Sequence, residues 1–258
     1  MRALCRFFAL VALVTWSGVG LAGVGERFIS GTHYDTLDAP VNTHDPKRIE
    51  VLEVFSYVCP HCFHFDPTLA SWRAKQPADV DFQRMPAVWN PQWRLFGQGY
   101  YAAQSLNIAE ASHMAMFKAL HVDQKRIETS ADLARMYANF GVADKDFLKA
   151  MDSFGVRASV QQADMRTRSY GVTGVPALIV NGRYRVTGEK AGSNDGMLEV
   201  VDFLVQKERD VRAAARAGVP AKASATKQIA AKTVAAKRGR ADKAVKTPAN
   251  KAEVAHQQ

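Results

Sequence analysis

The sequence predicts an α/β fold in which a block of helices interrupts the sheet, followed by a basic tail. An apolar, β-rich stretch over 51–57 leads directly into a Cys-Pro-His-Cys motif at 59–62 and then into a helical stretch. A long helical block separates the strand expected at 80–84 from the one expected at 176–180. Residues 23–210 are numerous enough for one domain with a sizeable core.

The first residues have the pattern of a secretory signal peptide. Two arginines open the chain, an apolar run covers 7–14, and small residues at 20–22 offer a cleavage site. The apolar run is shorter than the roughly 20 residues that a spanning helix needs, so we expect residues 1–22 to be removed. The mature chain then keeps only Cys59 and Cys62, and export into an oxidising compartment suits such a pair.

The residue pattern places four elements before the helical block. Alternating residues predict strands, and the residues after the cysteine motif predict a helix. In chain order these elements are a short edge strand at 33–37, a central strand at 48–55, a helix at 62–75 and a strand at 80–84.

Two helices of the block have recognisable ends. Ser130 can cap the first helix, and Gly141 can end it. Asp144 can begin the second helix, in which we expect four side chains to face inward, namely Phe147, Leu148, Met151 and Phe154. The remaining elements are a helix at 156–170, a strand at 175–180, an Asn-Gly hairpin turn at 181–182, a strand at 183–186 and a last amphipathic helix.

The composition changes sharply after residue 210. Residues 211–258 hold eleven Lys or Arg against two acids, so this segment carries +9, the net charge of the whole chain. Alanine favours helix, but the segment has no apolar stripe and its charges repel one another, so we expect a disordered Lys/Ala-rich tail. Such a tail suits an anionic envelope surface, or is a solvated appendage without a partner. Nucleic acid attracts the same charge, but we do not expect that partner for an exported protein.

The cysteine motif carries the chemistry, because a thiolate both attacks disulfides and leaves from them. Cys59 stands where a helix begins, so unsatisfied backbone N–H groups and the positive end of the dipole stabilise its anion. His61 can add a hydrogen bond or a positive charge, and Cys62 is the expected resolving partner. A zinc site completed by His61 and His64 would crowd four ligands at one helix start. A purely structural disulfide would close too short a loop to remove much chain entropy.

The motif, the strand before it and the Val175-Pro176 pair together resemble the thioredoxin superfamily, and the Pro-His dipeptide resembles the DsbA family of periplasmic disulfide oxidases. The order of elements is similar to a thioredoxin fold carrying that family's inserted all-helical domain, here at about 90–155, and the resemblance covers nearly all of 25–210. It implies a cis peptide bond before Pro176, with the backbone of Val175 offering hydrogen bonds to an extended substrate chain. A proline that merely opens an edge strand is the alternative.

Four other side chains are candidates for supporting roles. Glu53 lies on a strand of apolar neighbours, and a partly buried acid with a raised pKa can relay protons to Cys62. The resembled family carries a glutamate at this point, and a solvated glutamate at a sheet edge is the alternative. Asp66 matches an acidic position of the family's active-site helix, or merely complements the helix dipole. Trp89 and Trp93 line an apolar substrate groove or fill the core.

The resemblance implies an exported, monomeric thiol:disulfide oxidase of the periplasm that donates the Cys59–Cys62 disulfide to newly exported, unfolded proteins. A membrane quinone reductase of the DsbB kind would reoxidise the pair, and we expect no metal and no cofactor beyond it. A disulfide isomerase or reductase is the main enzymatic alternative, although the segment 23–47 has no room for the dimerisation domain of DsbC-like isomerases. A non-catalytic envelope chaperone or binding protein, using its groove or its basic tail, is the alternative of another class.

Overall fold

The computed structural model describes residues 26–218. The predicted signal peptide at 1–22 and the chain from 219 onward lie outside the described residues. Within 26–218, no helix is both long and apolar enough to cross a membrane.

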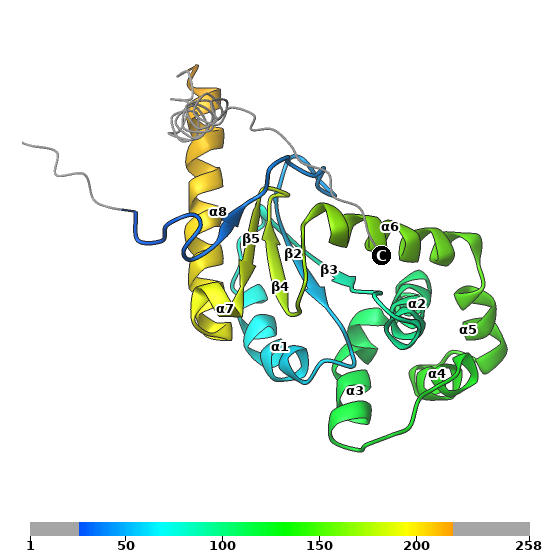
Figure 1. The fold of residues 1–258 in the computed structure, drawn as a ribbon. Coiled ribbons are helices and arrows are strands. Elements are labelled where there is room, and N and C mark those ends of the chain that lie inside the picture. Colours follow the sequence, from blue (N-terminus) through cyan, green and yellow to red (C-terminus); the bar gives the residue numbers. More distant parts are fainter. Residues whose placement is uncertain (1–25, 219–258) are drawn as a thin grey trace, which may run out of the picture.

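The core of the molecule is a five-stranded mixed sheet with the strand order β1-β5-β4-β2-β3 (Figure 1). β2 pairs parallel with β3, and the other neighbours pair antiparallel. All seven residues of the central strand β2 are buried, because helices cover the sheet on both faces. The strands are β1 (Asp35–Thr36), β2 (Ile49–Phe55), β3 (Val80–Pro86), β4 (Ala177–Val180) and β5 (Tyr184–Thr187).

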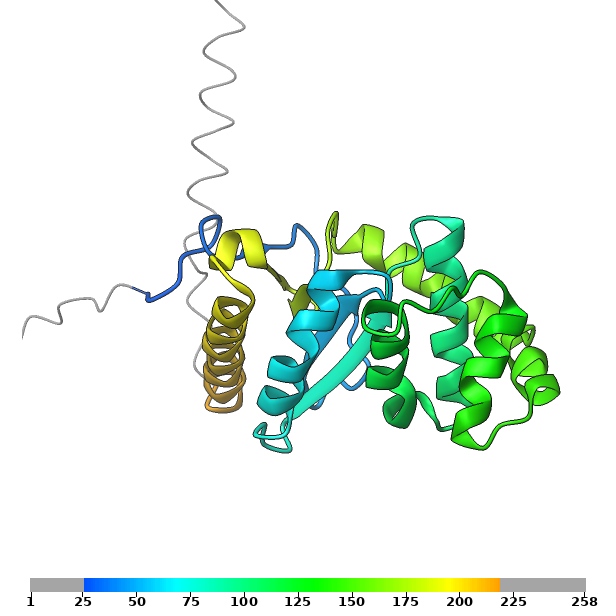
Figure 2. The ribbon, with the colours of Figure 1, turned by 90° about the horizontal axis from the view of Figure 1, so that it is seen from below.

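Alternate residues of β2 belong to two different cores. Val51 packs with apolar side chains of α1 (Pro60–Arg73) and α8 (Asn194–Arg216) on one face of the sheet. Leu52 and Val54 pack on the other face, where α6 (Phe154–Ser169) contributes Ala163. Figure 2 shows α1 and α8 on one side of the sheet and the main group of helices on the other. This arrangement leaves the carboxyl end of β2 between the two layers.

The helical block is inserted between β3 and β4, and its core also includes Phe55, Tyr57 and the two cysteines. The thioredoxin fold with an inserted helical domain is therefore confirmed. The block continues past residue 155, because α6 packs along α2 (Pro91–Ser105) and runs to Ser169. The short helix α7 (Gly188–Ala191) joins β5 to α8. The block comprises α2 (Pro91–Ser105), α3 (Ala109–His121), α4 (Ser130–Tyr137), a 3₁₀ turn (Ala138–Phe140), α5 (Asp144–Met151) and α6.

Two expectations for the block were wrong in detail. Thr129, not Ser130, caps α4, because its side chain and that of Asp132 form a reciprocal capping box. Phe147 and Met151 are buried as expected, but Leu148 is 37% exposed and Phe154 is 81% exposed. Phe154 is the first residue of α6, so it belongs to a new helix and does not continue the buried face of α5.

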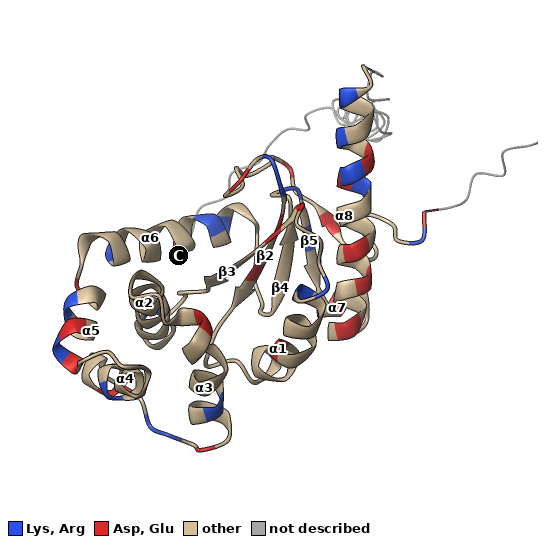
Figure 3. Cartoon of the chain, turned by 180° about the vertical axis from the view of Figure 1, so that it is seen from behind, with Lys and Arg blue, Asp and Glu red and all other residues tan. Residues whose placement is uncertain are grey.

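The expected boundary at residue 210 was also wrong. α8 continues to Arg216, so residues 211–216 belong to the folded domain and not to the tail. The Arg212 guanidinium donates hydrogen bonds of 2.9 and 2.8 Å to the carbonyls of Lys47 and Arg48, which ties this end of α8 to the start of β2. Figure 3 shows several basic residues on these last turns of α8.

Candidate active site

The cysteine pair lies where β2 ends and α1 begins. Three residues separate Phe55, the end of β2, from Cys59, which immediately precedes the first helical residue Pro60. Proline suits that position because its missing N–H would have no partner there. Cys59 is 8% exposed, Cys62 is fully buried, and both are free thiols in the structure. The helix α1 begins at Pro60, two residues before the start at Cys62 that the sequence predicted.

The two thiols have opposite acidities. A hydrogen bond from the Cys62 thiol lowers the pKa of Cys59 to about 6, against the effect of burial, and the backbone N–H groups of Cys62 and His61 and the charge of His61 lower it further. Burial raises the pKa of Cys62, and its hydrogen bond to Cys59 raises it again. Cys59 is thus a thiolate at neutral pH while Cys62 keeps its proton. Of the two sulfurs, Cys59 therefore has the acidity that suits a nucleophile and a leaving group.

The peptide bond between Val175 and Pro176 is cis, as the resemblance implied. The Cys59 thiol lies 3.4 Å from the carbonyl oxygen of Val175, so the segment before β4 borders the reactive sulfur. A cavity of about 260 Å³ opens here, between His61, the residues at 173–176 and the start of α7. The cysteine motif and the Val175-Pro176 pair, which the sequence singled out separately, therefore form one site, although Cys59 and Val175 are 116 positions apart in the chain.

Glu53 is fully buried in β2, which rules out the solvated glutamate. Its Oε2 accepts a 3.0 Å hydrogen bond from Arg84, while Oε1 is buried with no hydrogen-bond partner among the described residues. Burial raises the pKa of Glu53 to about 7, because the nearby charge of Arg84 only partly offsets it and Asp66 adds to it. The negative charge of Glu53 in turn helps to raise the pKa of Cys62. The charge of this buried carboxylate and the acidity of the resolving cysteine are therefore linked.

Asp66 is buried and belongs to the same charge network, so it does not merely complement the helix dipole. Its Oδ1 accepts hydrogen bonds from Arg84 at 3.0 Å and from His113 at 3.1 Å. Burial opposes ionisation of Asp66, but His113 and Arg84 outweigh it and lower the pKa. Glu53, Asp66 and His113 offer metal-ligating atoms within 4.8 Å of one another. Arg84 already bonds both carboxylates, so it supplies the positive charge that a metal ion would bring.

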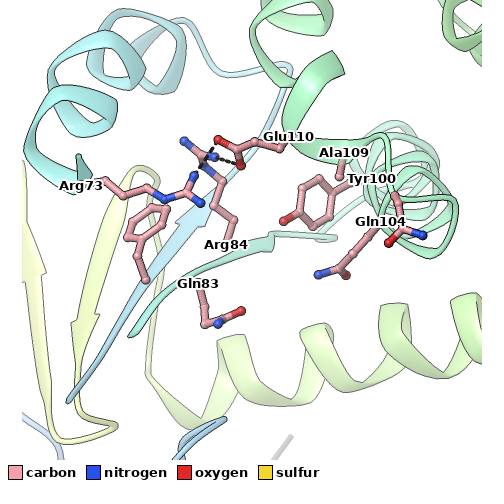
Figure 4. A pocket seen from close by; sticks show the side chains of 9 residues that line it. Arg73, Gln83, Arg84, Tyr100, Gln104, Ala109 and Glu110 are labelled. Carbon is pink, nitrogen blue, oxygen red and sulfur yellow. Dashed lines mark hydrogen bonds and ion pairs between the residues drawn. The ribbon is translucent and has the colours of Figure 1, made fainter. Parts of the chain in front are cut away.

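Arg84 connects this network to the surface. Its side chain is 6% exposed, and a third hydrogen bond, of 3.3 Å, reaches the exposed carboxylate of Glu110. Glu110 also accepts a 2.6 Å hydrogen bond from Arg73. Figure 4 shows both arginines pointing toward Glu110 at the edge of a cavity of about 390 Å³, which Tyr100 also lines. Part of the Arg84 side chain thus borders this solvent-facing cavity while its guanidinium holds the buried acids.

Two histidines of α3 hold Tyr57, which lies two residues before Cys59. The ionised Asp66 can only accept, so His113 donates from Nε2 and accepts at Nδ1 the 3.0 Å hydrogen bond of the Tyr57 hydroxyl. His121 donates from Nε2 to the Tyr57 carbonyl at 2.8 Å. The ring of His121 stacks on Phe63, directly after Cys62, with 5.1 Å between the centroids. The helical block therefore contacts both flanks of the cysteine motif.

The two tryptophans form a separate feature. Trp89 and Trp93 stack with 5.0 Å between their rings, and Trp93 packs partly against the core of the sheet. Trp89 is 40% exposed. Neither lines the cavity beside Cys59.

A cysteine that is a thiolate at neutral pH, beside a partner that keeps its proton, exchanges disulfides with other thiols. On a thioredoxin fold this defines a thiol–disulfide oxidoreductase. The comparisons with known proteins agree. Residues 85–194 match the model of the DSBA-like thioredoxin domain, a range that begins after the cysteine pair. The protein belongs to the DsbA family, as the following relatives show.

The thiol:disulfide interchange protein DsbA of Pseudomonas syringae pv. tomato is 39% identical over 206 residues, which are 80% of this chain and 96% of that protein. The DsbA of Pseudomonas aeruginosa is 36% identical over 205 residues, 79% of this chain and 97% of the relative. The crystal structure of Pseudomonas aeruginosa DsbA superposes with a TM-score of 0.70 at 36% identity, covering 73% of this chain and 98% of the other. Oxidoreductase DsbA from Xylella fastidiosa gives a TM-score of 0.67 at 35% identity and covers 70% and 98%.

Proposed function

We propose that the protein is a thiol:disulfide oxidase, which donates its Cys59–Cys62 disulfide to substrate proteins. The observation that supports this direction of exchange is the pKa of about 6 for Cys59. A stabilised thiolate favours the reduced pair, so the disulfide form gives up its bond readily. The raised pKa of Cys62 leaves Cys59 as the single stabilised anion.

The exchange takes place in two steps. A substrate thiolate attacks Cys59, a mixed disulfide forms, and Cys62 leaves and takes up a proton. A second substrate thiolate then attacks the substrate sulfur of the mixed disulfide, and Cys59 leaves as a thiolate. The substrate has lost two electrons and gained a disulfide, and the cysteine pair has been reduced. No further cofactor is required, because the cysteine pair itself carries the electrons.

Glu53 supplies the proton that Cys62 needs. Its pKa of about 7 leaves it partly protonated at neutral pH, and its Oε1 has no hydrogen-bond partner among residues 26–218, which supports a role as proton donor. His61 stabilises the Cys59 anion through its backbone N–H and its charge. With Glu53→Gln, release of Cys62 from its disulfide should slow in stopped-flow experiments, and the slowing should be greatest below pH 7.

The cis-proline segment binds the substrate chain. Val175 borders Cys59 through its carbonyl oxygen, so its backbone is placed to pair with an extended chain whose cysteine reaches Cys59. Extended, unfolded proteins present both the cysteine and the free backbone groups that this mode requires. Newly exported proteins are the substrates that fit.

The compartment and partners follow from the same role. An oxidase of this kind acts in the periplasm, and the signal sequence at 1–22 would direct its export there. We propose that it acts as a monomer. Its reduced pair must be reoxidised, and a DsbB-like membrane quinone reductase is the partner that would accept the electrons. The basic segment beyond residue 218 would hold the enzyme near anionic envelope surfaces.

The equilibrium of the cysteine pair with glutathione tests the direction of exchange. An oxidase should have a potential more positive than about −180 mV, whereas a value near about −270 mV would make the protein a reductase and contradict the proposal. Refolding of a reduced substrate supplies the second readout. The Cys59→Ser variant should form no mixed disulfide through position 59 and should not oxidise substrate.

A further inference from the structure

One acidic side chain lines the cavity beside the cysteine pair. Besides Glu189, the lining consists of neutral residues and His61. The register of the hairpin explains why Glu189 is there: Thr187 at the end of β5 pairs with Ala177, which follows Pro176 directly. The first residues of α7 therefore lie at the same end of the sheet as Val175 and Cys59.

The Glu189 carboxylate is exposed, and within residues 26–218 it forms neither a side-chain hydrogen bond nor an ion pair. Its neighbour Lys190 is engaged, since its ammonium donates to Asp35 at 2.6 Å and to the carbonyl of Gly31 at 2.9 Å. Lys190 is absent from the lining of the cavity. The two adjacent charges therefore have different surroundings. Lys190 bonds the edge of the sheet, whereas Glu189 lines the cavity beside the cysteine pair.

We propose that Glu189 makes the site selective for substrates with Lys or Arg next to the cysteine that is oxidised. The inference rests on the proposed oxidase function. A chain that extends past Val175 with its sulfur on Cys59 places a neighbouring side chain at the cavity. Lys and Arg have long apolar stems that can cross a cavity of about 260 Å³ while the charged group reaches the carboxylate. An acidic neighbour meets the same carboxylate and is repelled.

The other residues that line the cavity do not oppose the attraction of Glu189 for a cationic side chain. Thr173, Thr187 and Asn194 are neutral and can hydrogen-bond either kind of side chain. Within residues 26–218, Glu189 is thus the one carboxylate that lines the cavity, so its charge favours a cationic side chain over an anionic one. An exposed ion pair changes a rate constant by up to about fivefold, and it weakens as salt screens it.

The test uses the oxidised full-length protein and short peptides with two cysteines, in which one neighbour of a cysteine is Lys, Gln or Glu. Each neighbouring position is varied in turn, and stopped-flow fluorescence gives the second-order rate of oxidation. Glu189→Gln removes the charge with little change of shape. Glu199→Gln is the matched control, because Glu199 is an exposed acid of α8 that does not line the cavity. Dividing the Lys-to-Glu rate ratio of the wild type by that of the variant cancels the intrinsic reactivity of the peptides.

We expect this quotient to be about three to five at one of the two positions at low salt, and to approach one in high salt. Glu199→Gln should give a quotient near one, and Glu189→Lys should reverse the preference. Equal ratios in the wild type and Glu189→Gln at both positions would overturn the inference while leaving the oxidase function intact. If no peptide is oxidised by any form of the protein, the proposed function fails and the inference fails with it.

Discussion

The Arg84 guanidinium donates a 3.0 Å hydrogen bond to the Glu53 carboxylate across the parallel pair β2–β3. The two residues are direct register partners, so the sheet itself fixes their contact. The same guanidinium bonds Asp66 from α1. One buried cation therefore joins both strands to the active-site helix.

Replacing Arg84 should lower the free energy of unfolding far more than replacing Arg73, its neighbour nearer the surface. Arg84→Met leaves Glu53 and Asp66 buried without their cation, and breaking a buried pair in this way costs about 3–5 kcal/mol. Arg73→Met removes a partly exposed ion pair with Glu110, worth less than about 1 kcal/mol. Denaturant melts of the two variants measure the difference. Equal costs would show that Arg84 does not hold the network together.

Glu53 should make the folded protein less stable as the pH rises. Its pKa is about 7 in the folded state against an ordinary value of 4.5, so the folded state holds this proton more tightly than the unfolded state does. Stability is therefore lost between about pH 4.5 and 7, by at most about 3 kcal/mol. Glu53→Gln cannot lose a proton, so its stability relative to the wild type should rise over this window. Parallel stability–pH curves for the two proteins would show that Glu53 has an ordinary pKa.

The sequence predicted the reactive parts of the site because they are local signals. The cysteine motif directly follows a buried strand, and Val175-Pro176 directly precedes another, so spacing and resemblance located both. Arg84 and His113 were not found, because an arginine in an alternating strand and a histidine in a helix have no local pattern. Their partners, Glu53 and Asp66, lie 31 and 47 positions away in the chain. Only the packing of α1, α3 and the sheet brings these groups together.

The tail boundary shows a different limit. Composition changes at residue 210, but α8 continues because its buried residues up to Glu208 fix the helix and Arg212 anchors the next turn to the start of β2. Helix propensity is a weak guide where tertiary contacts determine the end of an element. Phe154 shows the same limit. Helical spacing predicted an inward side chain, but a new helix starts after its N-cap Ser153, and Phe154 is exposed.

The reduced protein should become more stable than the oxidised protein as the pH rises from about 6 to about 8.5. The pKa of Cys59 is about 6 in the folded state and near about 8.5 when unfolded, so the stabilisation is complete above the unfolded value and is lost as the pH falls through 6. Thiolate absorbance should titrate with the same midpoint. His61→Ser should raise that midpoint, while Cys59→Ser should abolish the titration. An oxidised form that is the more stable one at pH 8 would make the pair a structural cross-link.

Truncations before and after the end of α8 should behave differently. Removal of residues 219–258 keeps all contacts of α8 that the structure describes, so stability and peptide oxidation should not change. Removal of 211–258 deletes the Arg212 hydrogen bonds to Lys47 and Arg48, and should cost about 2 kcal/mol or more. Arg212→Ala in the full chain should reproduce part of this loss in denaturant melts. Equal stability of the two truncated chains would return the domain boundary to residue 210.

The shorter truncation also tests contact with an anionic surface. Residues 219–258 contain nine Lys or Arg and two acids, a net charge of +7 on a segment without aromatic residues. Binding to vesicles of acidic lipid should therefore be strong at low salt and weaken as screening shortens the Debye length to about 8 Å. Co-sedimentation with vesicles measures this binding, with neutral vesicles as the control. The chain that ends at residue 218 should lose the binding. Binding that survives this truncation, or that ignores salt, would assign the contact to the folded domain.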